Sequence, residues 1–332
     1  MAKAQLVDKF GRVHDYLRIS LTERCNLRCF YCMPECGIEL RDKNIFMTEE
    51  ETLAIATIFT ELGVNKIRLT GGEPLIKKNA KDLIEGIGQL PVKLAITSNG
   101  VLVDRFVDTF KKANLKTINI SIDSIDKFKF NEITRRDYYD RIVNNIELLL
   151  MEGFRVKLNV VAIRGVNDSE IAAFINLTQY HDLAVRFIEF MPFDGNKWNW
   201  DKMLSYKEIM NDVDGHFKPE NVERIADEPN DTSKNYRIKG YIGSFGVISP
   251  VSNPFCESCN RIRLTADGKI KNCLFGQEEF DILTPFRRGE DIKPLIVDAI
   301  QAKHESRGGI KSLDHKFDSE SWKNRSMTTI GG

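Results

Sequence analysis

The chain has 332 residues, and its 48 Lys and Arg residues balance its 48 Asp and Glu residues, so its formal net charge is zero. This balance gives no electrostatic reason to expect a nucleic acid or an anionic membrane as a partner. No apolar run approaches the ~20 residues of a membrane-spanning helix, and residues 1–11 carry charges without an apolar signal core. Seven cysteines in two groups fit metal ligation in a reducing compartment better than disulfides. We therefore predict a cytoplasmic protein.

Short β-branched runs alternate with helical stretches from about residue 15 to residue 193. The predicted strands are 17–21, 66–70, 93–97, 117–122, 155–162 and 185–190. The predicted helices are 48–62, which opens on a Thr-x-x-Glu capping box, 79–89, 104–113, 138–151 and 168–179. This alternation predicts a parallel βα array, and six units are too few for a closed eight-unit barrel. We therefore predict an α/β fold with an open (β/α)6 partial TIM-type barrel over residues 12–193.

The alternation stops after Pro192. A short helix is expected at 205–212, strands and turns from about 236 to 280, and helix again at 281–302. We predict that residues 194–303 form a C-terminal strand-and-turn domain, and that 304–332 form a polar tail ending in Gly331-Gly332.

Cys25, Cys29 and Cys32 form a C-x3-C-x2-C run just after the first predicted strand. A cubane iron–sulfur cluster needs four ligands, so three thiolates leave one iron open. An open metal position is typical of catalytic rather than structural sites. The alternative is zinc, which usually takes four N or S ligands. Cys36 could close the cluster as a fourth ligand, but neither its spacing nor Gly37 after it matches the ferredoxin pattern, so we expect a spare thiol.

A second set of three cysteines lies near the other end of the chain, at Cys256, Cys259 and Cys273. The residues between the last two predict two strands joined by a tight turn at Asp267-Gly268. Such a hairpin would return Cys273 to the other two cysteines and create a second site with an open iron. Zinc with a histidine ligand is the competing interpretation, but no histidine lies between residues 216 and 304.

Several basic residues lie on or beside predicted strands among apolar neighbours: Arg18, Arg68, Lys157, Arg261 and Arg263. A buried cation costs several kcal/mol unless it is paired, and guanidinium groups suit phosphate oxygens. We therefore expect a triphosphate as the substrate group. The alternative is a set of salt bridges to the strand-end acids Glu73, Asp123 and Glu189.

Four segments together resemble the GTP 3',8-cyclase family, also called the molybdenum cofactor biosynthesis protein A family, of the radical S-adenosylmethionine (SAM) superfamily. They are residues 17–29, residues 67–74 with Gly71-Gly72-Glu73-Pro74, residues 255–263, and the terminal Gly-Gly. The resemblance covers essentially the whole chain. It implies two 4Fe-4S clusters, one on each cysteine set, with SAM on the open iron of the first and the guanine of GTP on that of the second.

The resemblance also implies roles for single residues. Catalytic roles would fall to Cys25, Cys29, Cys32, Gly331 and Gly332. SAM would be bound by Tyr31, Gly72, Ser121 and Met191. GTP would be bound by Arg18, Arg68, Thr97, Lys157, Arg261, Ile262 and Arg263.

In the reaction implied by the resemblance, a 5'-deoxyadenosyl radical abstracts the ribose 3' hydrogen of GTP. The resulting carbon radical attacks C8 of guanine, and a reductant then quenches the product radical. The expected partners are GTP, an electron donor of the flavodoxin or ferredoxin type and a downstream cyclic pyranopterin monophosphate synthase, with the enzyme a monomer or a homodimer. No nucleic acid or membrane partner is expected.

Two other functions fit parts of the sequence. A peptide-modifying radical SAM maturase would share the first cysteine set, but it would not need five cations around its substrate. A non-catalytic carrier with two clusters would need neither the Gly-Gly-Glu-Pro loop nor the large βα region.

Overall fold

The computed structural model describes residues 5–33, 41–311, 313, 317 and 324–331. Its strands are β1 (Tyr16–Ser20), β2 (Lys66–Thr70), β3 (Lys93–Ser98), β4 (Thr117–Ser121), β5 (Arg155–Ala162), β6 (Leu183–Glu189), β7 (Val222–Arg224), β8 (Ser233–Ile238), β9 (Ser244–Ile248), β10 (Arg261–Leu264), β11 (Lys269–Lys271) and β12 (Phe280–Asp281). Its α-helices are α1 (Glu49–Glu61), α2 (Ala80–Gly88), α3 (Val107–Lys112), α4 (Lys127–Thr134), α5 (Tyr139–Met151), α6 (Ile171–Asn176), α7 (Tyr206–Phe217), α8 (Leu283–Arg287), α9 (Lys293–Gln301) and α10 (Met327–Ile330).

The first six strands form the parallel βα array that the sequence predicts. Neighbouring strands from β1 to β6 pair in parallel and in chain order. The predicted bounds of β2 and β5 agree with the structure, and the other four strands differ by one or two residues at one or both ends. Helix α1 begins with the predicted capping box, in which Thr48 and Glu51 bond to each other's backbone amides. The fold is thus α/β with a mixed sheet.

The helix prediction was less complete than the strand prediction. Helix α4 was missed, since its sequence alternates Lys, Phe and polar residues without a helical apolar period. The predicted helices at 104–113 and 168–179 each divide into a 3-10 turn and a short α-helix.

Strands from the C-terminal part of the chain extend both edges of the parallel array. In the described residues the strand order is β12-β11-β10-β1-β2-β3-β4-β5-β6-β9-β8-β7. Strand β10 pairs in parallel with β1, and β9 pairs in parallel with β6. The sheet is therefore continuous across residue 193, where the sequence predicts a domain boundary.

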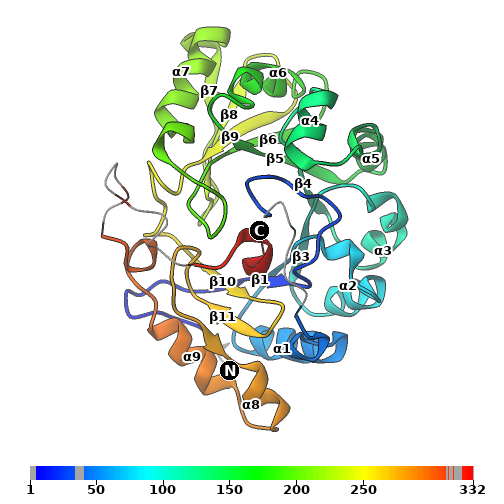
Figure 1. Cartoon of the computed structure of the whole chain (residues 1–332), viewed down its shortest axis with the longest axis vertical. Coiled ribbons are helices and arrows are strands. Elements are labelled where there is room, and N and C mark those ends of the chain that lie inside the picture. Colours follow the sequence, from blue (N-terminus) through cyan, green and yellow to red (C-terminus); the bar gives the residue numbers. More distant parts are fainter. Residues whose placement is uncertain (1–4, 34–40, 312, 314–316, 318–323, 332) are drawn as a thin grey trace.

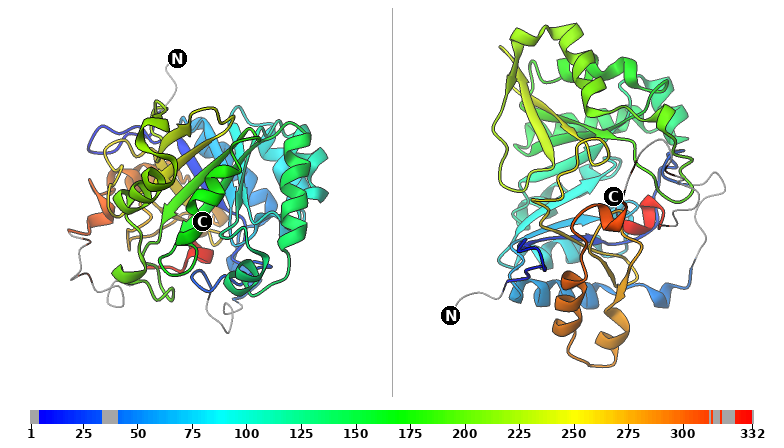
Figure 2. Two further views of the ribbon diagram at one scale, coloured as in Figure 1. Left: turned by 90° about the horizontal axis from the view of Figure 1, so that it is seen from above. Right: turned by 90° about the vertical axis from the view of Figure 1, so that its left-hand side faces the viewer.

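The apolar core lies between the sheet and the helices that surround it. Fully buried side chains include Leu17, Ile67 and Phe187 from strands and Phe59 and Phe174 from helices. Figure 1 shows α1 to α6 outside the strands, whereas α10 at the C-terminus lies within the curve of the sheet, and Figure 2 shows the same arrangement from two other sides. No helix in the described part of the chain has the length and apolar character to span a membrane.

Candidate active site

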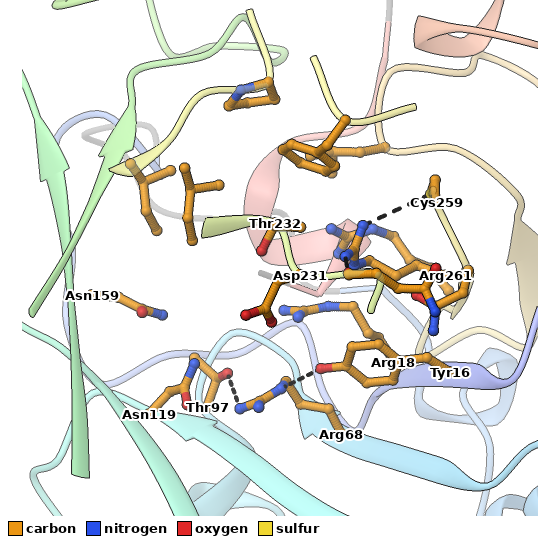
Figure 3. Close-up of a pocket in the computed structure, with 18 of the residues that line it drawn as sticks. Tyr16, Arg18, Arg68, Thr97, Asn119, Asn159, Asp231, Thr232, Cys259 and Arg261 are labelled. Atoms are coloured by element: carbon orange, nitrogen blue, oxygen red, sulfur yellow. Dashed lines mark hydrogen bonds between the residues drawn. The ribbon is translucent and has the colours of Figure 1, made fainter. Parts of the chain in front are cut away.

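A cavity of about 450 Å³ lies on the inner side of the sheet. Side chains from β1, β2, β3, β4, β5, β6 and β10 reach it, together with the loops that carry the second cysteine set. Its described lining includes nine basic residues: Arg18, Lys66, Arg68, Lys93, Lys157, Arg186, Arg261, Arg263 and Lys271. Asp231 is the one acidic residue among the described residues that line it. Figure 3 shows several of these side chains converging on one space. The cavity is therefore built for an anion.

Three of the arginines stand side by side in the sheet. Arg263, Arg18 and Arg68 are register partners across β10, β1 and β2, and neighbouring strands are only ~4.8 Å apart. Like charges at adjacent positions of a sheet destabilise it. The three guanidinium groups therefore repel one another, and an anionic ligand between them would reduce this repulsion.

The pKa values of these groups reflect the same repulsion. Burial, with the charges of neighbouring arginines, lowers the pKa of Arg18 to about 10 and that of Arg263 to about 9. Burial and the charge of Arg186 lower the pKa of Lys157 to about 8. Burial opposes ionisation of Tyr16, yet Arg68 and Arg18 lower its pKa to about 7, and its hydroxyl accepts a hydrogen bond of 2.6 Å from Arg68 Nε.

The alternative of salt bridges to strand-end acids does not account for these cations. The carboxylates of Glu73, Asp123 and Glu189 accept hydrogen bonds from hydroxyl groups and backbone amides. None of the three lines the cavity.

The sequence prediction missed several cavity residues. Arg186 lies on β6 between apolar neighbours, the same signal that selected Arg18, so it could have been found. Four buried polar atoms on the lining have no hydrogen-bond partner among the described residues: Arg186 Nε, Asn119 Oδ1, Asn159 Oδ1 and Asn260 Oδ1. Unsatisfied buried polar atoms are costly, so they also indicate a polar ligand.

The other predicted GTP residues differ in their positions. Thr97 lines the cavity, and its hydroxyl lies 3.3 Å from Arg68 Nη1. The side chain of Ile262 is fully buried in the apolar core, because alternate residues of β10 face opposite sides of the sheet. The predicted contact of Ile262 with GTP could therefore be made only by its backbone, and it stays a prediction.

The second cysteine set lies at the same cavity. Cys256, Cys259 and Cys273 all line it. The predicted hairpin is confirmed: β10 and β11 pair antiparallel, and Gly268 in the turn has a φ of +69°. Burial raises the pKa of Cys273. Burial also opposes ionisation of Cys259, yet nearby Lys303 and Arg261 lower its pKa.

The first cysteine set lies beside the Gly-Gly-Glu-Pro loop. The backbone amide of Gly72 donates to Thr22 O at 2.6 Å, and a Cβ on Gly72 would lie 2.2 Å from the carbonyl oxygen of Arg24. Glycine is therefore required for this close packing. Cys25 Sγ accepts hydrogen bonds from Leu27 N at 3.4 Å and from Asn99 Nδ2 at 3.6 Å. Cys36 lies outside the described residues.

Of the four predicted SAM residues, Met191 lines the cavity, whereas Tyr31, Gly72 and Ser121 do not. Ser121 ends β4. The hydroxyl of Tyr31 donates to Asp123 at 2.5 Å, and Asp123 also accepts from the amide of Val161, a lining residue. The region around the first cysteine set thus adjoins the cavity without forming its wall.

The C-terminal tail reaches the carboxyl ends of β1 and β2. Arg263 Nη1 donates to the carbonyl oxygen of Gly331 at 2.6 Å. Gly331 has a φ of +84°, and a Cβ there would lie 2.7 Å from Thr70 Oγ1 and 2.8 Å from Ser20 Cβ. Only glycine fits such a position without strain. Gly332 lies outside the described residues.

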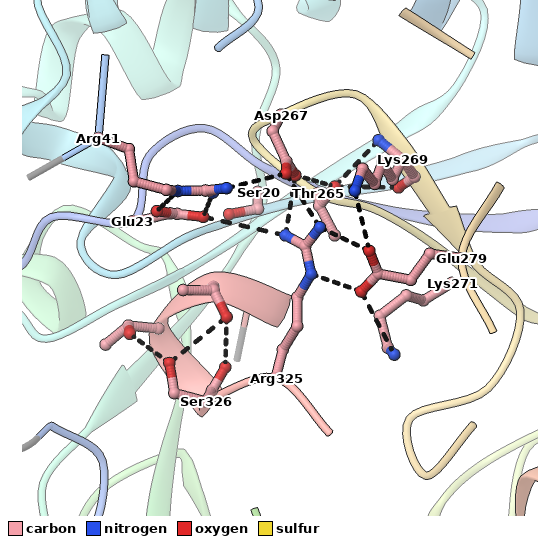
Figure 4. A network of polar contacts seen from close by, with 12 residues as sticks. Ser20, Glu23, Arg41, Thr265, Asp267, Lys269, Lys271, Glu279, Arg325 and Ser326 are labelled. Carbon is pink, nitrogen blue, oxygen red and sulfur yellow. Dashed lines mark hydrogen bonds and ion pairs between the residues drawn. The ribbon is translucent and has the colours of Figure 1, made fainter. Parts of the chain in front are cut away.

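A network of ion pairs anchors this tail (Figure 4). Arg325 donates two hydrogen bonds to Asp267 at 2.8 and 2.9 Å and two to Glu279, of which the one from Nη2 measures 2.6 Å. Asp267 also pairs with Arg41, which pairs in turn with Glu23 of the loop before Cys25. The tail, the β10–β11 turn and the first cysteine loop are therefore joined.

The six described cysteines are free thiols in two sets of three, and thiolate sulfur is the donor type that iron–sulfur clusters take. No group of three His, Cys, Asp or Glu side chains in the described part of the chain is arranged to hold one metal ion. In a cluster each thiolate binds a different iron, so the sulfurs lie farther apart than around one ion. N–H groups donate to Cys25, Cys256 and Cys259, as is usual around cluster ligands.

Two family models match the chain. The model of the radical SAM superfamily matches residues 19–178, and that of Molybdenum Cofactor Synthesis C matches residues 183–308. The chain is 43% identical to the mitochondrial GTP 3',8-cyclase of Arabidopsis thaliana, over 98% of this chain and 83% of that protein. The chain belongs to the GTP 3',8-cyclase family. The resemblance found in the sequence motifs is thus confirmed, and the family consists of radical SAM enzymes.

Other comparisons agree with this membership. The GTP 3',8-cyclase of Peptoclostridium acidaminophilum is 39% identical over 99% of both chains. The chain spans about half the length of several other curated relatives, which are named molybdenum cofactor biosynthesis protein 1. The crystal structure of Streptococcus suis SuiB bound to the precursor peptide SuiA superposes with a TM-score of 0.62, covering 97% of this chain and 72% of that one, at 14% identity. At that identity the likeness concerns the fold alone.

Proposed function

We propose that this chain converts GTP to (8S)-3',8-cyclo-7,8-dihydroguanosine 5'-triphosphate, the first step of molybdenum cofactor biosynthesis. The observation that carries the proposal is one cavity that combines nine basic residues with the second cysteine set. Its volume of about 450 Å³ is within the range of small-molecule sites.

The arginine row would bind the triphosphate. Guanidinium forks match phosphate oxygens, and Arg263, Arg18 and Arg68 lie in one row across three strands. Cys256, Cys259 and Cys273 would hold a cluster whose open position takes the guanine. GTP held at both ends would have its ribose fixed between them, so the chain would contribute mainly orientation and exclusion of water.

The first cysteine set would hold the other 4Fe-4S cluster, on Cys25, Cys29 and Cys32. A cluster held there would supply, together with SAM, the radical chemistry needed to abstract the ribose 3' hydrogen. Tyr31, Gly72 and Ser121 would orient SAM, and Met191 would contact it from the cavity side. Gly331, hydrogen-bonded to Arg263, would complete the site.

The remaining parts of the proposal concern the setting of the enzyme. Its six parallel βα units would form a partial barrel over residues 12–193, with an auxiliary-cluster region at 194–303 and a tail at 304–332. A flavodoxin or ferredoxin would supply electrons, and a cyclic pyranopterin monophosphate synthase would consume the product. We propose a cytoplasmic monomer or homodimer, although the Arabidopsis thaliana relative is named mitochondrial.

Anaerobic incubation of the reconstituted protein with SAM, dithionite and GTP tests the function. We expect GTP to be consumed in step with the release of 5'-deoxyadenosine. Release of 5'-deoxyadenosine that does not depend on GTP, with GTP recovered intact, would contradict the proposal. The nine cations of the cavity favour a compact polyanion over the peptide substrate of a maturase.

A further inference from the structure

A buried ammonium group lies against the second cysteine set. Lys303 follows α9, and only 3% of it is exposed. Its Nζ donates to Asn272 O at 2.5 Å and to Arg261 O at 3.1 Å, and it lies 3.6 Å from Cys259 Sγ. Two of these three partners are neutral carbonyl groups, and the third is a cysteine sulfur.

Among the described residues, Lys303 thus lacks the usual counter-ion of a buried cation. None of the ion pairs found among the described residues includes it. An unpaired buried charge costs several kcal/mol. A charge-compensating anion is therefore expected close to Nζ, and the nearest group that can become one is the Cys259 thiol.

The hydrogen bonds of Lys303 also join the two segments that carry the cysteines. Arg261 follows Cys259 by two residues, and Asn272 directly precedes Cys273. The amide of Arg307 donates to Cys256 Sγ at 3.4 Å, and Arg12 donates to Cys256 O at 2.8 Å. Lys303, Arg307 and Arg12 thus donate to the cysteine segments without lining the cavity.

We propose that Lys303 is the counter-ion and positioning residue of the second cluster, holding the Cys259 and Cys273 segments together and raising the reduction potential of that cluster. The inference rests on the proposed function, since it requires a cluster at this site. A cluster bound by three thiolates is anionic, and one-electron reduction makes it more so. A fixed positive charge at hydrogen-bond distance stabilises the reduced form more than the oxidised form.

The test uses the full-length protein with Cys25, Cys29 and Cys32 replaced by Ser, so that only the second cluster assembles. The variants are Lys303→Gln, which keeps N–H donors without the charge, and Lys303→Arg, which keeps the charge. Lys293→Met is the matched control, because it removes one positive charge from α9 at an exposed residue paired with Glu61. The measurements are iron content and the midpoint potential from a dithionite titration followed by electron paramagnetic resonance.

We expect Lys303→Gln to shift the midpoint potential to more negative values with iron retained, and Lys303→Arg and Lys293→Met to stay near the parent. Loss of iron in Lys303→Gln but not in Lys303→Arg would also support the role of Lys303 as a counter-ion, because only the variant without the charge would lose the cluster. An unchanged potential in iron-loaded Lys303→Gln would overturn the proposal, and so would loss of iron in both variants. If the protein with only Cys25, Cys29 and Cys32 replaced by Ser binds no iron, the second cluster does not exist. That result would contradict the proposed function.

Discussion

The two cysteine sets have the same number of thiols but opposite electrostatic surroundings. Around the first set, burial and the carboxylate of Glu73 raise the pKa of Cys25 to about 11, and burial, Cys25 and the carboxylate of Asp123 raise that of Cys32 to about 12. Around the second set, Lys303 and Arg261 lower the pKa of Cys259 in spite of its burial. The two sets of three thiols thus differ in the charges beside them, which are carboxylates at the first set and Lys303 and Arg261 at Cys259 of the second.

This difference matches the two tasks in the proposed mechanism. A cluster near carboxylates is harder to reduce and, once reduced, is a stronger reductant, as cleavage of SAM requires. A cluster on the second set, near cations, would have a higher potential and would lie where an anionic substrate collects. The contrast teaches that the environment of the thiolates, rather than their number, separates the two sites.

The largest effect is expected from the first cysteine set. Replacing Cys29 with Ser should abolish SAM cleavage, since a ligand of the SAM-binding cluster is lost, and leave the iron of the second cluster in place. Release of 5'-deoxyadenosine measures SAM cleavage, and iron analysis measures the cluster that remains. Cys36→Ser is the control and should stay nearly fully active; equal losses in the two variants would make Cys36 a ligand.

The mirror experiment replaces Cys273 with Ala. Because the two sets lie in different segments, this variant should keep the first cluster and its ability to cleave SAM, while GTP binding and cyclisation are lost. Spectroscopy of the variant resolves the two clusters. Disappearance of all iron would show that the sites assemble together.

Removal of Gly331 and Gly332 should reduce cyclisation severely while both clusters and the melting temperature stay unchanged. The reason is the position of Gly331, between Arg263 and the ends of β1 and β2. A synthetic peptide ending in Gly-Gly should restore part of the activity in trans. Full turnover by the truncated enzyme would remove the tail from the mechanism.

Substitution of the cavity arginines should have a smaller effect than the cysteine and tail variants, and this effect should concern the binding of GTP and not that of SAM. Arg261→Ala or Arg263→Ala should weaken GTP binding by about 1–3 kcal/mol, or about 5- to 150-fold in Kd, with SAM binding preserved. Calorimetric titrations with GTP and with SAM measure the two affinities separately. Arg263→Ala should also impair cyclisation at saturating GTP, because it releases Gly331, whereas Arg261→Ala should be rescued by high GTP.

The smallest effect is expected from Arg325, which acts on the tail from a distance. Arg325→Ala removes its hydrogen bonds to Asp267 and Glu279 and should lower cyclisation several-fold at unchanged GTP affinity. Arg325→Lys should recover only part of this, since Lys cannot make the forked contacts. Unaltered kcat in Arg325→Ala would show that Arg263 alone holds the tail.

The sequence by itself determined those parts of the protein that depend on short segments. The spacing of the two cysteine sets, the parallel βα array and the turn at Asp267-Gly268 are local patterns, and the structure confirms the array and the turn. The capping box at Thr48 is local in the same way. Such features follow from periodicity and backbone preference within a few residues.

Only the tertiary structure decided which of these segments meet. The pairing of β10 with β1 joins residues about 245 apart in the chain and aligns Arg263 with Arg18, and no local pattern encodes such a register. The net charge of zero describes the whole chain and gives no sign that nine basic residues line one cavity. Long-range strand pairing depends on burial of both sheet faces together, so the cavity, the buried Lys303 and the inward tail become visible only when the sheet is assembled.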